Sequence, residues 1–262
     1  MYSPLGKNWI LLRGLARESA HWGAFVSQLQ VAFPDATITL LDLPGTGRFY
    51  LEASPSNIPD IVEQVRNQAL AQGLLKQPVT LLALSLGGMV AWEWLRRYPE
   101  DIAAASLMNT SFSNLSPFYQ RLRWQIYQDF IALLMTRKVY QREVQILQLT
   151  SNLQFQDDAI PSLWHSIQQE RPMSFSNSFR QIIAAARYKP CALKPTPPVL
   201  LLNGGGDRLV SPACSDAIQQ QYQLELRRHP WAGHDLTLDD GAWVIAQLQD
   251  WQVNLDRDRV CG

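Results

Sequence analysis

An apolar run stops at a serine in the stretch Leu81-Leu82-Ala83-Leu84-Ser85-Leu86-Gly87-Gly88. The residues before the serine, from Val79, predict a buried strand, and residues 89–98 after it predict a helix that ends before Pro99. Small residues lie two positions before and two positions after the serine, as a sharp turn from strand to helix requires. Such a turn exposes the side chain of Ser85 as a candidate nucleophile, whereas the simpler alternative is a serine that caps the helix.

The rest of the chain alternates short apolar runs with longer amphipathic ones. Strands are predicted at residues 8–13, 36–42, 79–84, 103–109, 199–203 and 224–229. Most are continuous runs of Leu, Val and Ile, which are typical of parallel strands buried on both faces. Helices are predicted between them, at residues 19–33, 57–72, 89–98, 213–222 and 242–253. This alternation predicts an α/β fold with a doubly wound, mostly parallel six-stranded sheet flanked by helices.

One long segment interrupts the alternation. From about residue 112 to residue 190 there is no strand pattern, and amphipathic helices are predicted at residues 118–135, 139–149 and 175–188. A long insertion in a regular α/β frame is usually functional. We therefore predict a core formed by residues 1–111 and 191–262, with a helical cap of residues 112–190 inserted after the fourth strand.

The composition argues against several classes of function. Lys and Arg together number 23, as do Asp and Glu, so the formal net charge is zero and no basic surface for nucleic acid is predicted. Cys191, Cys214 and Cys261 form neither a disulfide framework nor a metal-binding spacing, which fits a reducing compartment. The first apolar run, residues 9–12, is too short for a signal peptide or a membrane span. We expect a cytoplasmic monomer or weak dimer with no metal, no cofactor and no membrane partner.

Two polar residues near the C-terminus supply partners for the serine. A serine hydroxyl needs a base to take its proton, and a histidine oriented by an acid is well suited to this task. His234 follows the last predicted strand, and Asp207 follows a glycine-rich turn after the fifth. Loops at the carboxyl ends of parallel strands gather at one edge of the sheet, so we expect Ser85, Asp207 and His234 to meet there. Asp235 is a competing acid that would have to fold back on its neighbour, and Asp207 has the alternative of an Asx turn.

Backbone donors are needed as well, to hold the oxyanion that forms when a carbonyl is attacked. One is expected to be the N–H of Leu86, directly after the serine. The other belongs to the loop after the first strand, where we predict the N–H of Leu15, just past Gly14.

Taken together, these landmarks resemble the α/β-hydrolase family over nearly the whole chain. The matching segments are Arg13-Gly14, Trp22, residues 42–48, Ser85-Leu86-Gly87-Gly88, Asp207 and Gly233-His234. The chain looks closest to the small carboxylesterases that act on acyl or methyl esters. It is also similar to the menaquinone-pathway lyase of the same fold, which uses the same triad for an elimination. The chain departs from the family at Ala83, where the turn usually has glycine, and at Arg13, where the family usually has histidine. It also starts too close to its first strand for the family's N-terminal hairpin.

The resemblance implies a serine hydrolase that cleaves a small or medium carboxylic ester or thioester through an acyl-enzyme. The substrate would be a small acyl compound, free or attached to a larger carrier. One alternative is a lyase acting on an anionic substrate, which an arginine-lined pocket would favour, and another is a non-catalytic binding protein. Arg13, Trp124 and His165 are the candidate substrate-binding residues: the first for an anionic group, the other two as pocket walls contributed by the insertion.

Overall fold

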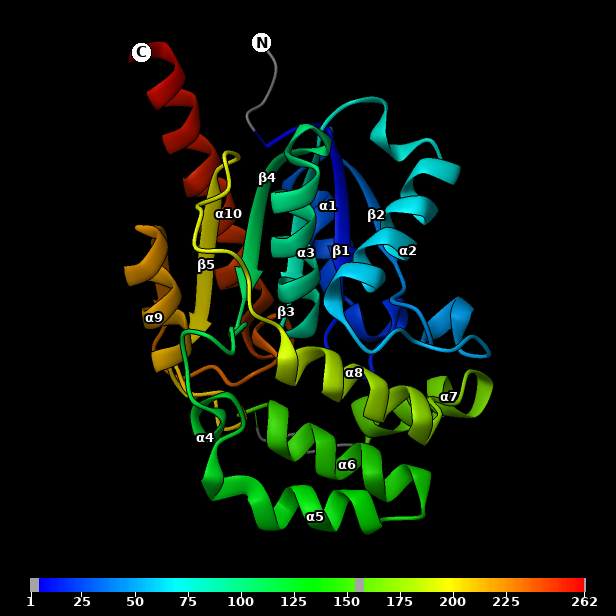
Figure 1. The fold of residues 1–262 in the computed structure, drawn as a ribbon. Helices are drawn as coiled ribbons and strands as arrows, with labels where there is room; N and C mark the ends of the chain where they lie inside the picture. The colour runs from blue at the N-terminus through cyan, green and yellow to red at the C-terminus, as the bar shows by residue number, and fades with distance from the viewer. Residues whose placement is uncertain (1–4, 154–157, 262) are drawn as a thin grey trace.

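The computed structural model describes residues 5–153 and 158–261 (Figure 1). Within these residues, one six-stranded sheet has the order β2-β1-β3-β4-β5-β6, and all neighbouring strands are parallel. The strands are β1 (Asn8–Leu12), β2 (Thr37–Leu41), β3 (Val79–Leu84), β4 (Ile102–Met108), β5 (Val199–Gly204) and β6 (Glu225–His229). The predicted parallel six-stranded sheet is therefore confirmed.

Helices cover both faces of this sheet (Figure 1). On one face lie α2 (Ile58–Ala71), α3 (Leu86–Arg97) and α9 (Ala213–Tyr222), and on the other lie α1 (Phe25–Ala32) and α10 (Leu236–Cys261). Short 3-10 helices are formed by Ser19–Trp22, Gly47–Phe49, Leu74–Lys76, Pro99–Asp101 and Trp124–Ile126.

Alternate side chains of the central strand enter two separate cores. Leu81 and Ala83 of β3 face α2, α3 and α9, whereas Leu82 and Leu84 face α1 and α10. All six residues of β3 are buried, which explains why its sequence is continuously apolar. Each fully buried leucine stabilises the fold by roughly 1.5–3 kcal/mol, so the strand that leads into Ser85 is firmly anchored.

The segment between β4 and β5 forms a helical cap beyond the carboxyl ends of the strands (Figure 1). Its helices are α4 (Phe118–Arg121), α5 (Tyr127–Met135), α6 (Val139–Thr150), α7 (Ala159–Glu170) and α8 (Phe175–Arg187). A cap after the fourth strand was predicted and is present, but α7 was not foreseen. Pro161 lies in the first turn of α7, where proline is tolerated, although in the sequence it resembles a helix breaker. The division at residues 112 and 190 stays a prediction.

Two sequence-based expectations concern what the chain lacks. No helix in the described part of the chain is both long and apolar enough to cross a membrane. Among residues 5–153 and 158–261, no three His, Cys, Asp or Glu side chains are grouped so that they could hold a metal ion. That the protein needs no cofactor stays a prediction.

Candidate active site

Ser85 occupies a strained turn between β3 and α3. Its φ is +56°, a left-handed value that costs a non-glycine residue about 1–3 kcal/mol. The turn is held by a hydrogen bond of 2.8 Å from the Ser85 N–H to the Met108 carbonyl. It also needs Gly87, because a Cβ there would lie 2.5 Å from the Leu12 carbonyl oxygen. Neighbours on both sides are buried while Ser85 is half-buried, so the turn presents its side chain outward.

His234 and Asp207 form a buried pair next to this turn. His234 Nδ1 lies 2.8 Å from Asp207 Oδ2. The other carboxylate oxygen, Oδ1, accepts the N–H groups of Leu209 at 2.8 Å and Val210 at 2.9 Å. An ionised carboxylate only accepts, so the proton of a neutral imidazole lies on Nδ1 and Nε2 is left as a base.

Asn109 ties together the loops that carry this pair. Its Nδ2 donates to the carbonyls of Gly233 at 3.1 Å and His234 at 2.8 Å, and its Oδ1 accepts the N–H of Gly204 at 2.9 Å. Its φ is +47°, which asparagine tolerates better than most residues. Asn109 was not predicted from the sequence to belong to the site. The signal was present, because a polar residue at the carboxyl end of a buried central strand lies where sites form.

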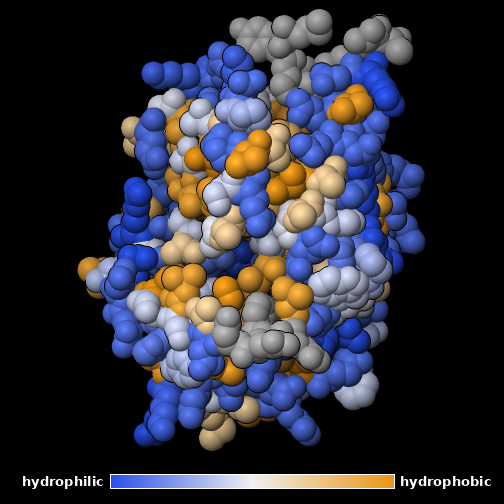
Figure 2. Space-filling model, turned by 180° about the vertical axis from the view of Figure 1, so that it is seen from behind, coloured by the Kyte–Doolittle hydropathy of each residue, from blue (hydrophilic) through white to orange (hydrophobic). Residues whose placement is uncertain are grey.

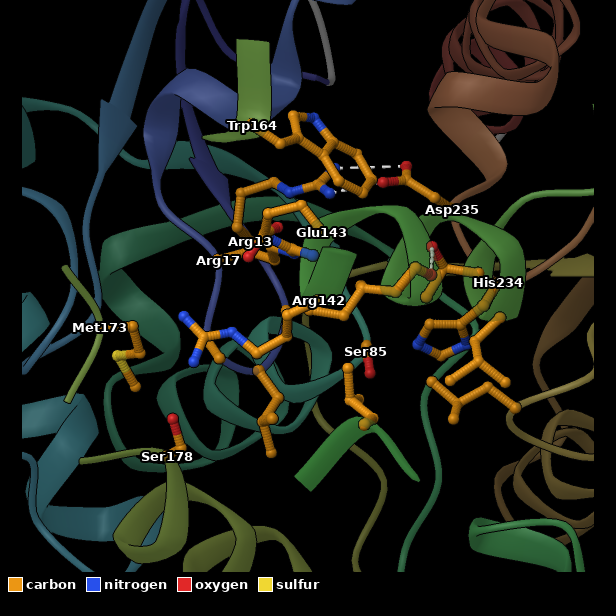
Figure 3. A pocket seen from close by; sticks show the side chains of 18 of the residues that line it. Arg13, Arg17, Ser85, Arg142, Glu143, Trp164, Met173, Ser178, His234 and Asp235 are labelled. Atoms are coloured by element: carbon orange, nitrogen blue, oxygen red, sulfur yellow. Dashed lines mark hydrogen bonds and ion pairs between the residues drawn. The ribbon is translucent and has the colours of Figure 1, made fainter. Parts of the chain in front are cut away.

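Ser85 and His234 line one cavity of about 230 Å³ between the sheet and the cap (Figure 3). Apolar side chains gather beside a hollow at the level where cap and core meet (Figure 2). The cap contributes apolar walls that include Phe130, Ile146, Leu149, Trp164 and Ile182. No hydrogen bond joins Ser85 Oγ to His234 Nε2 among the described residues, and such contacts often tighten only when substrate binds.

The loop after β1 presses against the serine. A Cβ on Gly14 would lie 3.2 Å from the Ser85 Cβ, and the next residue, Leu15, lines the cavity. Leu86 is the first residue of α3, so its N–H has no acceptor within the helix. Within the described part of the chain, neither the Leu15 nor the Leu86 N–H has a hydrogen-bond acceptor. Both predicted donors are therefore free.

A cap residue holds this loop from the other side. Gln181 of α8 is fully buried, accepts the Ala16 N–H at 2.9 Å and donates to the Pro44 carbonyl at 3.2 Å. Ala16 has a φ of +56°, so the loop adopts a costly backbone conformation at this contact. This role was not predicted from the sequence, because one glutamine in an amphipathic helix is usually a solvent-facing residue.

Arg13 lines the cavity, but its charge is already paired. Its guanidinium makes two contacts with Asp235, Nη2–Oδ2 at 2.5 Å and Nη1–Oδ1 at 3.3 Å, and lies 4.9 Å from the ring centre of Trp22. Burial alone would raise the pKa of Asp235, but Arg13 outweighs it by charge and hydrogen bonding, so this pKa lies below its usual value. The Arg13 cation is neutralised in the wall, which argues against the expectation that it is available for an anionic substrate. Asp235 is equally committed and does not compete with Asp207.

A second buried ion pair joins the loop to the cap. Arg17 Nη1 lies 2.6 Å from Glu143 Oε2, and its guanidinium lies 4.4 Å from the ring centre of Trp164. Both Arg17 and Glu143 line the cavity. The cap is therefore attached to the core by buried polar contacts at the site itself.

The other two predicted substrate-binding residues lie outside this cavity. Trp124 is 64% exposed in a 3-10 turn of the cap and is not part of the cavity wall. His165 is half-buried and packs edge-on against Tyr140, with ring centres 5.8 Å apart. Its neighbour Trp164 is one of the α7 residues that line the cavity, and successive helix residues point about 100° apart. Neither prediction is therefore supported by the position of the side chain.

Several solved structures share this fold. A thermophilic esterase from Thermogutta terrifontis has a TM-score of 0.71 and 18% identity, over 95% of this chain and 90% of that one. An enol-lactonase from Burkholderia xenovorans LB400 has a TM-score of 0.71 and 15% identity, over 94% and 91%. A lipase-esterase related protein from Clostridium acetobutylicum has a TM-score of 0.70 and 15% identity, over 95% and 96%. Identities this low show the fold alone.

The sequence itself matches a family description over most of its length. None of the curated proteins matches this chain. The sequence model of the alpha/beta hydrolase family matches residues 9–247, a range that includes strands β2 to β6, all of β1 except its first residue, the cap and the loops of Ser85, Asp207 and His234. Because this match spans nearly the whole chain, the protein belongs to the alpha/beta hydrolase family.

Proposed function

We propose that this family member is a serine hydrolase that cleaves a small or medium carboxylic ester or thioester. One observation carries the proposal: a serine in a strained turn shares an apolar cavity with the imidazole of a buried histidine–aspartate pair. A serine that only caps a helix would need neither a strained backbone nor a neighbouring histidine–aspartate pair. A cavity of about 230 Å³ is smaller than the roughly 300–1,000 Å³ that is usual for small-molecule sites, which favours a short or medium acyl group.

The mechanism follows from the roles these groups can play. Ser85 Oγ attacks the carbonyl carbon while His234 Nε2 takes its proton, and Asp207 stabilises the imidazolium and holds its orientation. The Leu15 and Leu86 N–H groups stabilise the oxyanion. The imidazolium then protonates the leaving alcohol or thiol, which leaves an acyl-enzyme. Water attacks this ester with the same histidine as base and releases the acid.

The lyase alternative has less support than the hydrolase. It was favoured by an arginine-lined pocket, and two of the arginines at the cavity, Arg13 and Arg17, are in ion pairs. A non-catalytic binding protein would not need the free backbone donors beside Ser85. Cytoplasmic location, a substrate attached to a carrier and a monomeric or weakly dimeric state remain parts of the proposal.

A fluorophosphonate probe and 4-nitrophenyl esters test this proposal. The wild type should be labelled at Ser85 and should hydrolyse short-chain esters. Ser85→Ala should abolish both without loss of folded structure, measured by circular dichroism. Ser27→Ala is the matched control, because Ser27 is exposed on α1 and its hydroxyl only bonds the Ala24 carbonyl. Unchanged hydrolysis in Ser85→Ala would remove Ser85 from the mechanism.

A further inference from the structure

In the part of the chain that the structure describes, one arginine of the cavity wall has no acidic partner. Arginines 13, 17 and 142 line it. Arg13 is paired with Asp235, and Arg17 with Glu143. Among the residues that the structure describes, the Arg142 guanidinium has no acidic partner and no hydrogen bond. An apolar cavity therefore contains a cation that is available to a ligand.

This cation lies away from the candidate nucleophile. Arg142 comes from α6, and Figure 3 shows its guanidinium on the side of the cavity where Met173 and Ser178 lie. Ser85 and His234 lie on the other side of the same view. A substrate whose carbonyl is at Ser85 would thus extend toward Arg142 with its remote end.

A second donor is available at the same end. Gln168 of α7 is 6% exposed and lines the cavity, and its Oε1 accepts the Met173 N–H at 3.1 Å. That bond fixes which end of the amide is the oxygen, because the Met173 N–H can donate to the amide oxygen but not to the amide NH₂. The Gln168 Nε2 has no acceptor within the described part of the chain. Met173 therefore places an amide donor on the Arg142 side of the cavity.

We propose that Arg142, with Gln168, binds a carboxylate at the remote end of the substrate's acyl chain. This inference rests on the proposed hydrolase function and names its substrate class: half-esters or thioesters of dicarboxylic acids. A guanidinium donates two N–H groups to a carboxylate in a planar, charge-assisted contact. A neutral acyl chain of equal length would instead remove water from the cation without replacing its hydrogen bonds.

Matched esters test the proposal directly. The half 4-nitrophenyl esters of adipic and suberic acid are compared with neutral 4-nitrophenyl hexanoate and octanoate, whose acyl chains have the same number of carbons. Wild type should favour the half-esters in kcat/KM. Arg142→Met should lower kcat/KM for the half-esters by about 10-fold to 100-fold, mainly through KM, and should not lower kcat/KM for the neutral esters, which then no longer desolvate a cation. Equal losses for both kinds of ester, or no preference in the wild type, would overturn the proposal.

Two controls separate this proposal from the one on which it rests. Arg180→Met removes an exposed arginine from α8, outside the cavity wall, and should leave the preference unchanged. Calorimetric binding to Ser85→Ala needs no turnover and compares suberate, supplied as its monomethyl ester with one free carboxylate, with neutral methyl octanoate. Suberate should bind at least tenfold more tightly, and Arg142→Met in that background should abolish the difference. If binding follows this pattern but no ester is cleaved, the hydrolase proposal fails and the anion site stands. If neutral esters are cleaved but suberate has no advantage, the anion site fails alone.

Discussion

Gln181→Met tests whether the cap is part of the catalytic apparatus. The substitution keeps the volume of the side chain but removes both of its hydrogen bonds, to the Ala16 N–H and to the Pro44 carbonyl. Each bond contributes about 1 kcal/mol net, and a buried carbonyl without a partner costs about 1–3 kcal/mol. Ala16 is half-buried, so water can partly replace its lost acceptor. We expect the free energy of unfolding to fall by about 2–4 kcal/mol.

The effect on turnover comes from the neighbouring residue. Leu15 supplies the proposed oxyanion donor one position before Ala16, and release of the loop lets that N–H drift. Loss of one such donor lowers kcat by about 100-fold to 1,000-fold in a serine hydrolase, so a loosened donor should lower it by roughly 10-fold to 100-fold. KM should change little, because the acyl pocket is intact. Steady-state kinetics on a neutral ester, well below the melting temperature, measure both constants.

Asn177→Leu is the matched control for this prediction. Asn177 lies one turn earlier on α8 and makes three comparable bonds to the core, from the Ser54 N–H and to the Glu52 and Gly45 carbonyls. Asn177→Leu should lower the free energy of unfolding by about as much as Gln181→Met does, and should keep kcat within about threefold of the wild type. Equal falls in kcat for the two variants would mean that cap docking in general is responsible. A Gln181→Met variant with wild-type kcat would refute the role of the loop contact.

Three further substitutions probe other contacts of the site. Asp207→Asn should lower kcat by about 10,000-fold with normal folding, because an amide can stabilise the wrong imidazole tautomer; stopped-flow and steady-state rates measure it. Arg13→Met should cost about 3–5 kcal/mol in chemical denaturation, since it leaves Asp235 buried without its partner. The pKa of Asp235 is lower in the folded protein than in the unfolded protein, where it is about 3.9, so ionised Asp235 stabilises the wild type at pH values above about 3.9. This stabilisation is lost as the pH falls toward the folded pKa. The midpoint of acid unfolding of Arg13→Met should therefore lie at a higher pH than that of the wild type. Gly87→Ala should destabilise the fold by roughly 1–3 kcal/mol or more, because its Cβ would press on the Leu12 carbonyl.

Patterns of hydrophobicity were sufficient to predict the frame. The strand at residues 79–84 and the helix at residues 213–222 have the predicted bounds, because each is a continuous pattern ended by a turn signal. The predicted helix at residues 19–33 is instead split at Gly23, whose φ is +51°. The last element, Leu236–Cys261, is interrupted by non-helical backbone at Asp240, so the helix after this kink begins close to the predicted residue 242 but continues past the predicted end at residue 253. Local propensity thus identified the elements better than their limits.

The contacts between distant segments were not accessible in the same way. The order of Ser85, Asp207 and His234 along the chain indicates that they meet, because loops after parallel strands share an edge. Nothing comparable links Arg13 to Asp235, Arg17 to Glu143 or Ala16 to a glutamine of the cap. Those pairs depend on where the cap helices lie on the core, and amphipathic patterns do not specify that placement. The sequence could therefore place Arg13 at the cavity but not show that its charge is neutralised.

The distribution of these ion pairs has a consequence for how the site selects its substrate. Buried carboxylates neutralise Arg13 and Arg17 near the loop after β1, so that wall of the cavity offers shape and hydrophobic contact but little charge. A neutral wall next to the oxyanion donors leaves their partial charges as the main field acting on the carbonyl. Recognition of a charged group is then left to the remote end, where Arg142 lies. Turnover and selectivity would depend on different residues, so substitution at Arg142 should change which ester is preferred without changing how fast a bound neutral ester reacts.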